Sequence, residues 1–453
     1  MKKIVCVLCA TLLLNASDTK VSDSLNLSEA MEILKSENLE IKAATQDVKS
    51  ARVDAMSALG SHFGKLDFIQ DALNSNDAGN VFGFKVASRE ATFGDFGFSE
   101  FDSTNPNILT VQPEDLNNPE ARNFFQSKLK YEIPLFTGFQ ISSYVNIMDA
   151  LTKMKGLEKD QIINEKTYQL RKSFYDMALL KHSKEHLETI LENIATLENM
   201  TNEMIKVGYA KKIDLLEVQA KKGNVERLVA QMNSNQTLLY HYISFLLNKE
   251  VKDIVTSSTL VPMISYTNEE ILNNNIDIQR ATTGLTIRKN MVDVKKASYY
   301  PMVGAFAEVS TADDTFLGDA SDHLAYTAGA RLTWNIFNGG SDYNNIEKSR
   351  IEHLKTKTQV QLAKSGISLQ IEKIRTEIAS FDLEISSLEK ELALADEIYS
   401  NYENRYREKL SSMSDVIIKQ SEQILKISQL QQAQNKRNER IFALEKLANG
   451  EQK

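Results

Sequence analysis

The side chains whose types and spacing could do chemistry include two histidines in a long polar stretch. His182 and His186 are four residues apart, a spacing that places two metal ligands on one face of a helix. The neighbouring Lys181, Lys184 and Glu185 are typical of a solvated helix face, and no H-E-x-x-H pattern is present. We therefore expect no metal site at this pair.

The sequence lacks the common catalytic and nucleotide-binding motifs. It has no G-x-S-x-G elbow for a serine nucleophile and no G-x-x-x-x-G-K-[ST] loop for phosphates. Its two cysteines, Cys6 and Cys9, lie in an N-terminal segment that has the pattern of a secretory signal, with Lys2 and Lys3, an apolar run over 4–14 and a small-residue cleavage site at 14–16. We expect an exported protein that is not an enzyme and binds no cofactor.

Charge and hydropathy limit which partners and which membrane-spanning structures the chain can have. The 453 residues carry a formal net charge of −8, which disfavours nucleic acid as a partner and suits an acidic aqueous lumen. After the signal, no run approaches the roughly 20 apolar residues of a membrane-spanning helix. If the protein crosses a membrane, we expect it to do so as a closed β-barrel.

The chain repeats its own pattern at a fixed distance. Residues 134–139 resemble residues 335–340, with Phe136 and Phe337 lying 201 residues apart. The same offset brings 207–215 onto 408–416, without a gap. Earlier matches are weaker and indicate about 38 extra residues in the first repeat. We predict a signal peptide over 1–16, a first repeat over 17–248, a linker over 249–266 and a second repeat over 267–453.

Each repeat reads as a helix, a strand, a loop, a strand, a very long helix, a tight turn and a shorter helix. The strands are expected over 62–72, 126–136, 301–310 and 323–337. In the second, Leu129, Tyr131 and Ile133 alternate with Lys130 and Glu132. Such alternation fits a strand half-buried on a soluble core, and equally a strand with its apolar side to lipid and its polar side to a water-filled lumen. The signal and the helices favour lipid.

The long helices are predicted from a sparse supply of proline and glycine. After Gly138 the chain reads as helical to about Lys206, a length of roughly 100 Å. Apolar residues at heptad spacing predict coiled-coil packing. They include Ile385, Leu388, Leu392, Ala395, Tyr399, Tyr402 and Tyr406, and Leu215, Val218, Val225, Val229, Met232, Leu239, Ile243 and Leu246.

Four strands in one chain are too few to close a barrel, since the smallest stable barrels have about eight. A single chain would also leave strand edges open in lipid. Several copies must therefore share one barrel, and three copies would give twelve strands. The insertion around 74–123, rich in Asn, Asp, Gly and Phe, is expected to be a long extracellular loop with room for an extra strand.

Together these features resemble the TolC family of outer-membrane factors. The resemblance implies a mainly α fold with a transmembrane β-barrel portion, formed by a homotrimer with a 12-stranded barrel, a 12-helix α-barrel and an equatorial belt near 249–266. It also implies outer-membrane lipid, a periplasmic adaptor (membrane fusion) protein and an inner-membrane pump of RND or ABC type as partners. The residues that carry the resemblance are Pro134, Gly138, Gly339 and Gly340 at the strand–helix junctions, and 207–215 and 413–416 at the helical turns.

The resemblance also implies which residues close the pore. Asp214 and Tyr406 match a closing network, and Asp415 matches an acidic ring that lines the aperture. Ser411 stands where the family's best-known network has an Arg, and Ile418 where a second ring Asp can occur. The closed state here is therefore expected to depend on hydrogen bonds and packing. Three Asp415 side chains around an axis would raise one another's pKa and attract cations.

The same positions have a plainer structural interpretation. Asp is favoured at helix N-caps, so Asp214 and Asp415 are also interpreted as N-caps after the turns. The two interpretations are compatible.

The helical tips, expected to receive the adaptor, differ in sequence. Val207, Gly208 and Tyr209 read as a C-cap with Gly in the left-handed conformation, whereas Lys409 takes the Gly position beside Leu410. We expect the two tips to differ and to present different docking grooves.

Three functions remain open from the sequence. The first is the exit duct of a small-molecule efflux system, and the second is the exit duct of type I protein secretion. The third is a periplasmic coiled-coil scaffold without a pore, for which lipid-facing strands would be unnecessary.

Overall fold

The computed structural model describes residues 24–256, 259–316, 318 and 321–449. The predicted signal peptide, residues 1–16, lies outside the described residues. The chain divides into two compact units, one holding 1–44, 159–276 and 366–453, and the other holding 45–158 and 277–365. Both units draw on both halves of the duplicated sequence.

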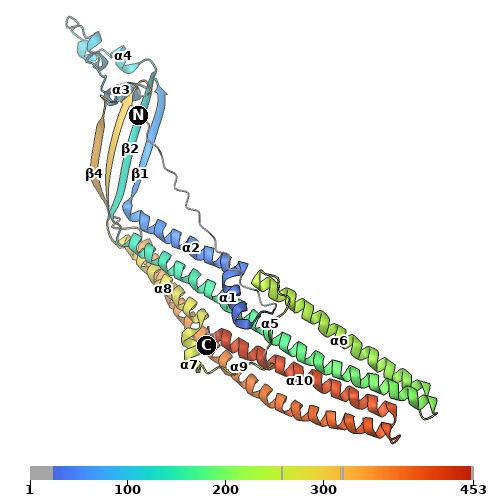
Figure 1. Cartoon of the computed structure of the whole chain (residues 1–453). Helices are drawn as coiled ribbons and strands as arrows, with labels where there is room; N and C mark the ends of the chain where they lie inside the picture. Colours follow the sequence, from blue (N-terminus) through green and yellow to red (C-terminus); the bar gives the residue numbers. More distant parts are fainter. Residues whose placement is uncertain (1–23, 257–258, 317, 319–320, 450–453) are drawn as a thin grey trace, which may run out of the picture. The chain divides into compact units, whose positions relative to one another are not determined.

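The elements follow the order that each repeat predicted (Figure 1). Their bounds are α1 Leu27–Glu37, α2 Leu39–Gly60, β1 Lys65–Ser75, α3 Ala78–Ala87, α4 Glu114–Asn117, β2 Arg122–Phe136, α5 Gln140–Lys206, α6 Lys212–Leu247, α7 Asn268–Asn274, α8 Ile276–Lys296, β3 Met302–Asp313, β4 Ala325–Thr333, α9 Ser341–Arg407 and α10 Met413–Ala448. Short 3-10 turns join several of them.

The duplication is visible in the lengths of the helices. α5 and α9 each have 67 residues, and α6 and α10 each have 36. Every one of these four helices begins and ends 201 residues from its counterpart. The predicted long helices and the offset of 201 residues are therefore confirmed.

The strands form one antiparallel sheet in the order β1-β2-β3-β4 (Figure 1). Directly opposed residues of neighbouring strands lie on the same face of the sheet. The observed register places apolar side chains on one face and polar side chains on the other. One cross-strand row contains Phe68, Leu129, Val309 and Tyr326. All four are exposed in the single chain, so this face presents an apolar row to its surroundings. An exposed apolar surface of this kind is typical of a contact with lipid or with another protein.

The other face of the same sheet is polar. A row on that face contains Asp67, Lys130, Glu308 and Thr327. One ion pair joins Lys130 to Glu132 at 2.7 Å, and another joins Lys128 to Glu308 across two strands at 3.5 Å. The predicted separation of apolar and polar faces is confirmed.

Several predicted strand boundaries are corrected. β1 begins at Lys65 rather than near 62, because a 3-10 turn occupies 61–63, and it continues to Ser75. β2 starts earlier, at Arg122, and β3 continues to Asp313. β4 ends at Thr333 rather than 337, so the alternation of 334–337 has no partner strand among the described residues.

The insertion around 74–123 differs from its expected form. Its described residues contain the helices α3 and α4 and short 3-10 turns. Among the described residues of the insertion no separate strand is found; only its two ends are in strands, where β1 extends to Ser75 and β2 begins at Arg122.

The helices α5, α6, α9 and α10 share a core that contains part of the predicted heptad stripe, including Val218, Val225, Tyr399 and Tyr406. Its fully buried members include Ile194, Leu197, Val218, Val225 and Val416, in a cluster to which α5, α6, α9 and α10 all contribute. Packing of these four helices buries the apolar stripe and leaves the polar faces to solvent. This core positions the two turns that join α5 to α6 and α9 to α10.

The segment after α6 packs on the C-terminal part of α10. Val261 and Ile264 are almost completely buried. The Asn438 side chain accepts a hydrogen bond from the Val261 amide at 2.9 Å and donates one to the Thr259 carbonyl at 2.7 Å. That this segment belongs to an equatorial belt stays a prediction.

Candidate functional site

The two helical turns have the same backbone conformation. Gly208 has a φ of 80°, and the Tyr209 amide donates to the Met204 carbonyl at 2.8 Å. Lys409 has a φ of 67°, and the Leu410 amide donates to the Arg405 carbonyl at 2.8 Å. Both turns therefore end their helices with a left-handed residue and a back-bonded amide. The two tips therefore share a backbone conformation and differ in their side chains, and the expectation that they present different docking grooves stays a prediction.

A side-chain contact joins the two turns. The Lys409 ammonium lies 3.3 Å from the centroid of the Tyr209 ring, which is cation–π geometry. Both residues are exposed. A lysine in the left-handed region is unfavourable by about 1 kcal/mol relative to glycine. The contact with Tyr209 gives this lysine a role that the sequence alone did not reveal.

Asp214 and Asp415 cap their helices, although not at the predicted position. Each is the third residue of its helix, while Lys211 and Ser412 occupy the N-cap positions. The Lys211 amide donates to Asp214 Oδ2 at 2.7 Å, and the Ser412 hydroxyl donates to Asp415 Oδ2 at 2.6 Å. The interpretation as N-caps is corrected: these carboxylates satisfy the N-cap amides from inside the first turn.

The surroundings of Asp415 favour its charged form. Hydrogen bonds from the Ser412 side chain and backbone, together with the Ser411 hydroxyl and the charge of Arg405, lower the pKa of the Asp415 carboxyl. Ser411 Oγ lies 3.4 Å from Asp415 Oδ2. Ser411 thus contacts Asp415 directly. The pattern Ser-x-x-Asp before an apolar run could have identified Ser412 from the sequence.

Tyr406 is buried and bonded within the helical core. Its hydroxyl lies 3.3 Å from Thr201 Oγ1, and its side chain is 6% exposed. Burial, assisted by the charge of Asp214, raises the pKa of the Tyr406 hydroxyl, although the Thr201 contact opposes this. Asp214 is close enough to act on Tyr406, while its carboxylate is engaged with the Lys211 amide. Sequence reasoning missed Thr201, whose only signal was a hydroxyl within an apolar stripe.

Further polar contacts connect the N-terminal parts of α6 and α10. The Ser414 hydroxyl donates to Glu217 at 2.7 Å, and the Lys221 ammonium donates to Ser421 Oγ at 2.7 Å. With the Tyr209–Lys409 contact, these bonds hold together the two helical hairpins of one chain, α5–α6 and α9–α10. All of them are broken if the hairpins separate.

The tips also expose apolar side chains. Six such residues near the turns are between 49% and 66% exposed. Exposed apolar side chains gathered on one region are typical of protein–protein contact sites. They are Val207, Tyr209, Ile213, Leu216, Leu410 and Ile418.

Both strand–helix junctions contain left-handed residues, and the first also has a bulge. The register between β2 and β3 shifts at Pro134. Gly138 has a φ of 62°, and a Cβ there would meet the Ala297 carbonyl oxygen at 2.7 Å. Gly339 and Gly340 are also left-handed but border open space. The first junction is therefore packed and the second is not.

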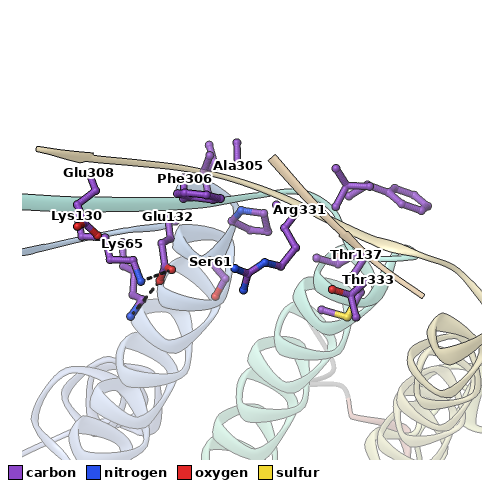
Figure 2. A pocket seen from close by; sticks show the side chains of 17 residues that line it. Ser61, Lys65, Lys130, Glu132, Thr137, Ala305, Phe306, Glu308, Arg331 and Thr333 are labelled. Atoms are coloured by element: carbon purple, nitrogen blue, oxygen red, sulfur yellow. Dashed lines mark ion pairs between the residues drawn. The ribbon is translucent and has the colours of Figure 1, made fainter. Parts of the chain in front are cut away.

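A groove lies on the polar face of the sheet, near the start of β1 (Figure 2). Its volume is about 780 Å³. Figure 2 shows Lys65 and Lys130 paired with Glu132, at 3.5 and 2.7 Å. The Arg331 guanidinium lies 6.0 Å from the Phe306 ring centroid. Among the described residues, no carboxylate forms an ion pair with Arg331. Arg331 was not predicted from the sequence as a site residue.

Two clusters contain residue types that often bind metal ions. His182 Nε2 and His186 Nε2 are 3.1 Å apart, and the two rings meet edge to face. Glu90, Asp313 and Asp314 place their carboxylates within 4.8 Å of one another. Arg122 forms ion pairs with Glu90 and with Asp314, and so neutralises part of that charge.

None of the helices in the described part of the chain combines the length and the apolar character needed to cross a membrane.

Comparison with known proteins gives a family model and a set of solved structures. Residues 268–450 match the model of the outer membrane efflux protein family. No curated protein matches the chain significantly. The fold is similar to that of CusC (TM-score 0.77, 13% identity, 94% of this chain and 92% of that chain). It is also similar to VceC, an outer membrane protein of Vibrio cholerae (0.75, 14%, 94% and 96%).

A third similar structure is the outer membrane channel CmeC of Campylobacter jejuni (TM-score 0.73, 12% identity, 93% of this chain and 85% of that chain). At these identities the likeness establishes the fold. The predicted fold class, mainly helical with a small antiparallel sheet of barrel strands, is confirmed.

Proposed function

Because residues 268–450 match the outer membrane efflux protein family and the chain has the fold of known outer membrane channels, we propose that it is one subunit of the exit duct of a tripartite efflux system. Outer membrane efflux proteins are transport ducts rather than enzymes. In the proposed assembly three copies share one 12-stranded barrel in the outer membrane and one helical tunnel in the periplasm. Small molecules leave the cell through it.

The observation that carries this proposal is the sheet. Its four strands separate a fully exposed apolar row, which contains Phe68 and Tyr326, from a polar face with charged residues. An apolar face of this kind is stable against lipid, and the polar face is stable against water. Its two edges, β1 and β4, have no further strand beside them among the described residues. A second and third copy would pair them.

We assign the turns of the two hairpins to the periplasmic end of the duct. The exposed apolar side chains there, with Val207 and Leu410 at the tips, would dock on a periplasmic adaptor protein. An inner-membrane pump of RND or ABC type would supply the energy. Since the two tips share one backbone conformation, an adaptor would distinguish them by their side chains, Tyr209 against Leu410.

We further propose that the hairpin contacts hold the duct closed. Asp415 of each copy would form an acidic ring at the aperture, while Tyr406 and Thr201 pack behind it. The Tyr209–Lys409, Ser414–Glu217 and Lys221–Ser421 contacts take the place of the missing Arg. Opening would separate the hairpins and break these contacts.

A deletion strain tests the exported cargo. Loss of the protein should make cells sensitive to detergents and bile-like compounds, while secretion of proteins by type I systems continues. Complementation with the intact chain should restore resistance. Normal resistance combined with lost protein secretion would contradict the efflux assignment.

The second candidate is the exit duct of type I protein secretion, which uses the same fold. Cargo is selected by the pump, so the duct itself favours neither. A periplasmic scaffold without a pore is less consistent with the sheet, because a scaffold has no use for an exposed apolar face next to charged strands.

A further inference from the structure

The groove of Figure 2 contains one cation that has no anionic partner among the described residues. Lys65 is paired with Asp67 at 3.0 Å and with Glu132, and Lys130 is paired with Glu132. Arg331, in contrast, contacts the Phe306 ring. It is the single charged residue of β4. The strongest interaction of an arginine is bidentate pairing with a carboxylate, and within the described part of the chain Arg331 does not form such a pair.

The position of Arg331 points beyond the chain. It lies on β4, whose nine residues are all exposed, and β4 forms one edge of the sheet. The opposite edge is β1, whose polar face carries Asp67 and Asp71. β4 offers a positive charge and β1 offers negative charges on the same face. A second copy of the chain, placed edge to edge, therefore has complementary charges along its seam.

The register within the chain fixes where the two edges would meet. Lys65 lies opposite Glu132, Glu132 opposite Phe306, and Phe306 opposite Gly329. Arg331 lies two residues beyond Gly329 on β4. Because β4 runs opposite to β1, the cross-strand row through Arg331 lies at the level of residue 63, two residues before Lys65. If the barrel closed without tilt, Arg331 would face that level in the next copy.

Barrel strands tilt, and the tilt displaces the row. For twelve strands about 4.8 Å apart, with a rise of about 3.3 Å per residue, a tilt of 35–45° displaces the row by roughly 12–18 residues around the ring. With three equal copies, the displacement at each seam between copies is one third of this total, about four to six residues. The displacement must be even, since an odd one would turn polar side chains toward lipid.

A displacement of four residues places Arg331 opposite Asp67. The same displacement pairs every residue of β4, Ala325–Thr333, with residues 65–73 of β1 in the next copy. No residue of the β4 edge is then left unpaired. A displacement of six would place Arg331 opposite Ile69, which offers no charge. A displacement in the other direction would leave part of β4 unpaired in lipid, which is energetically prohibitive.

We propose that Arg331 forms an ion pair across the subunit seam with Asp67 of the neighbouring copy. The pair extends the Lys65–Asp67 and Lys65–Glu132 contacts into a network that closes the groove at each of three seams. It fixes the register between copies and places its charges on the lumen side. The inference rests on the proposed function, because it requires the shared barrel.

Cysteine cross-linking tests the register. The chain has only Cys6 and Cys9, both in the segment expected to be removed as the signal. Arg331→Cys combined with Asp67→Cys should give disulfide-linked dimers and trimers in a non-reducing gel, because directly opposed residues of an antiparallel pair lie within disulfide reach. Arg331→Cys with Asp71→Cys, displaced by about 13 Å along β1, should not. Each single substitution is a control.

Charge exchange tests the ion pair. Arg331→Glu alone and Asp67→Lys alone should lower the temperature at which the detergent-extracted trimer dissociates. Together they should recover most of that loss, whereas Arg331→Glu with Asp71→Lys should not. Glu308→Gln, on the central strand β3, is the matched lumen control and should leave the seam unchanged.

The outcomes separate this inference from the proposed function. Trimers whose 67–331 pair fails to cross-link, or whose charge exchange brings no recovery, would overturn the seam contact and leave the duct intact. A wild-type chain that is monomeric in mild detergent and membranes would overturn the duct itself.

Discussion

At the scale of single residues, the tips depend on a few polar contacts whose effects oppose one another. The cap bonds from Ser412 lower the pKa of the Asp415 carboxyl. A ring of three such carboxylates would raise it by mutual repulsion. Because the folded pKa within the chain is depressed, the stabilisation from this carboxylate is present above its unfolded pKa. It is lost as the pH falls through the folded pKa.

The first prediction concerns the pH dependence of ion selectivity. Because the cap bonds lower the pKa of the Asp415 carboxyl, the channel should keep its preference for cations as the pH falls to the ordinary value for Asp, about 3.9, and lose it only below that value. Ser412→Ala should move this loss to higher pH, while Ser414→Ala, which removes a bond to Glu217, should not. Bilayer conductance in a salt gradient measures it. A wild-type loss between about pH 5 and 6 would mean that repulsion in the ring outweighs the cap.

The second prediction concerns Tyr406. Tyr406→Phe removes the hydroxyl near Thr201, and Thr201 keeps its bond to the Leu197 carbonyl at 2.8 Å. The chain should lose about 1 kcal/mol of stability. The closed duct should also leak, seen as higher sensitivity to large antibiotics. Tyr402→Phe is the control, since its ring contacts with Arg405 and Lys419 do not use the hydroxyl. Equal leakage in both variants would contradict a gating role for Tyr406.

At the scale of elements, turns and junctions decide how accurately the helices and strands are placed. The long helices could be predicted from the sequence because α5 and α9 contain no proline in 67 residues each, and because α9 has apolar residues at heptad spacing from Ile385 to Tyr406. Strand ends were less predictable. β4 ends at Thr333 although alternation continues to Ile336, because pairing with β3 stops at Met302. Periodicity does not contain that information.

The candidate site was predictable to a similar degree. The family resemblance singled out Asp214, Tyr406 and Asp415, and each of them forms a hydrogen bond in the structure. It did not show that Lys409 would adopt the left-handed conformation, since tertiary contact with Tyr209 offsets an unfavourable backbone. The roles of Thr201 and Arg331 were missed because they depend on neighbours distant in sequence.

The third prediction compares the two strand–helix junctions. Gly138→Ala should destabilise the chain strongly, because the new Cβ would meet the Ala297 carbonyl oxygen at 2.7 Å in addition to the backbone strain. Gly340→Ala should cost only the strain, about 1–2 kcal/mol, since nothing in the described part of the chain lies within 4 Å of its Cβ position. Thermal unfolding followed by circular dichroism measures both. Equal shifts would show that packing at the first junction is unimportant.

At the scale of the whole molecule, the chain is incomplete alone. Within the described residues, its sheet has two open edges and an exposed apolar face, and its groove leaves Arg331 without a carboxylate. In the proposed assembly, further copies around one axis would satisfy each of these features. The helical unit adds turns with exposed apolar side chains and uses one backbone conformation in both halves. A shared pore accounts for all of these features together.

The measurement that tests this account most directly is planar-bilayer conductance of the detergent-extracted protein, with sizing to count its subunits. The account predicts a trimer that forms discrete channels with a preference for cations, and a reduced preference in Asp415→Ala. A soluble monomer without conductance would contradict it, and the alternation of the strands would then reflect only a half-buried sheet.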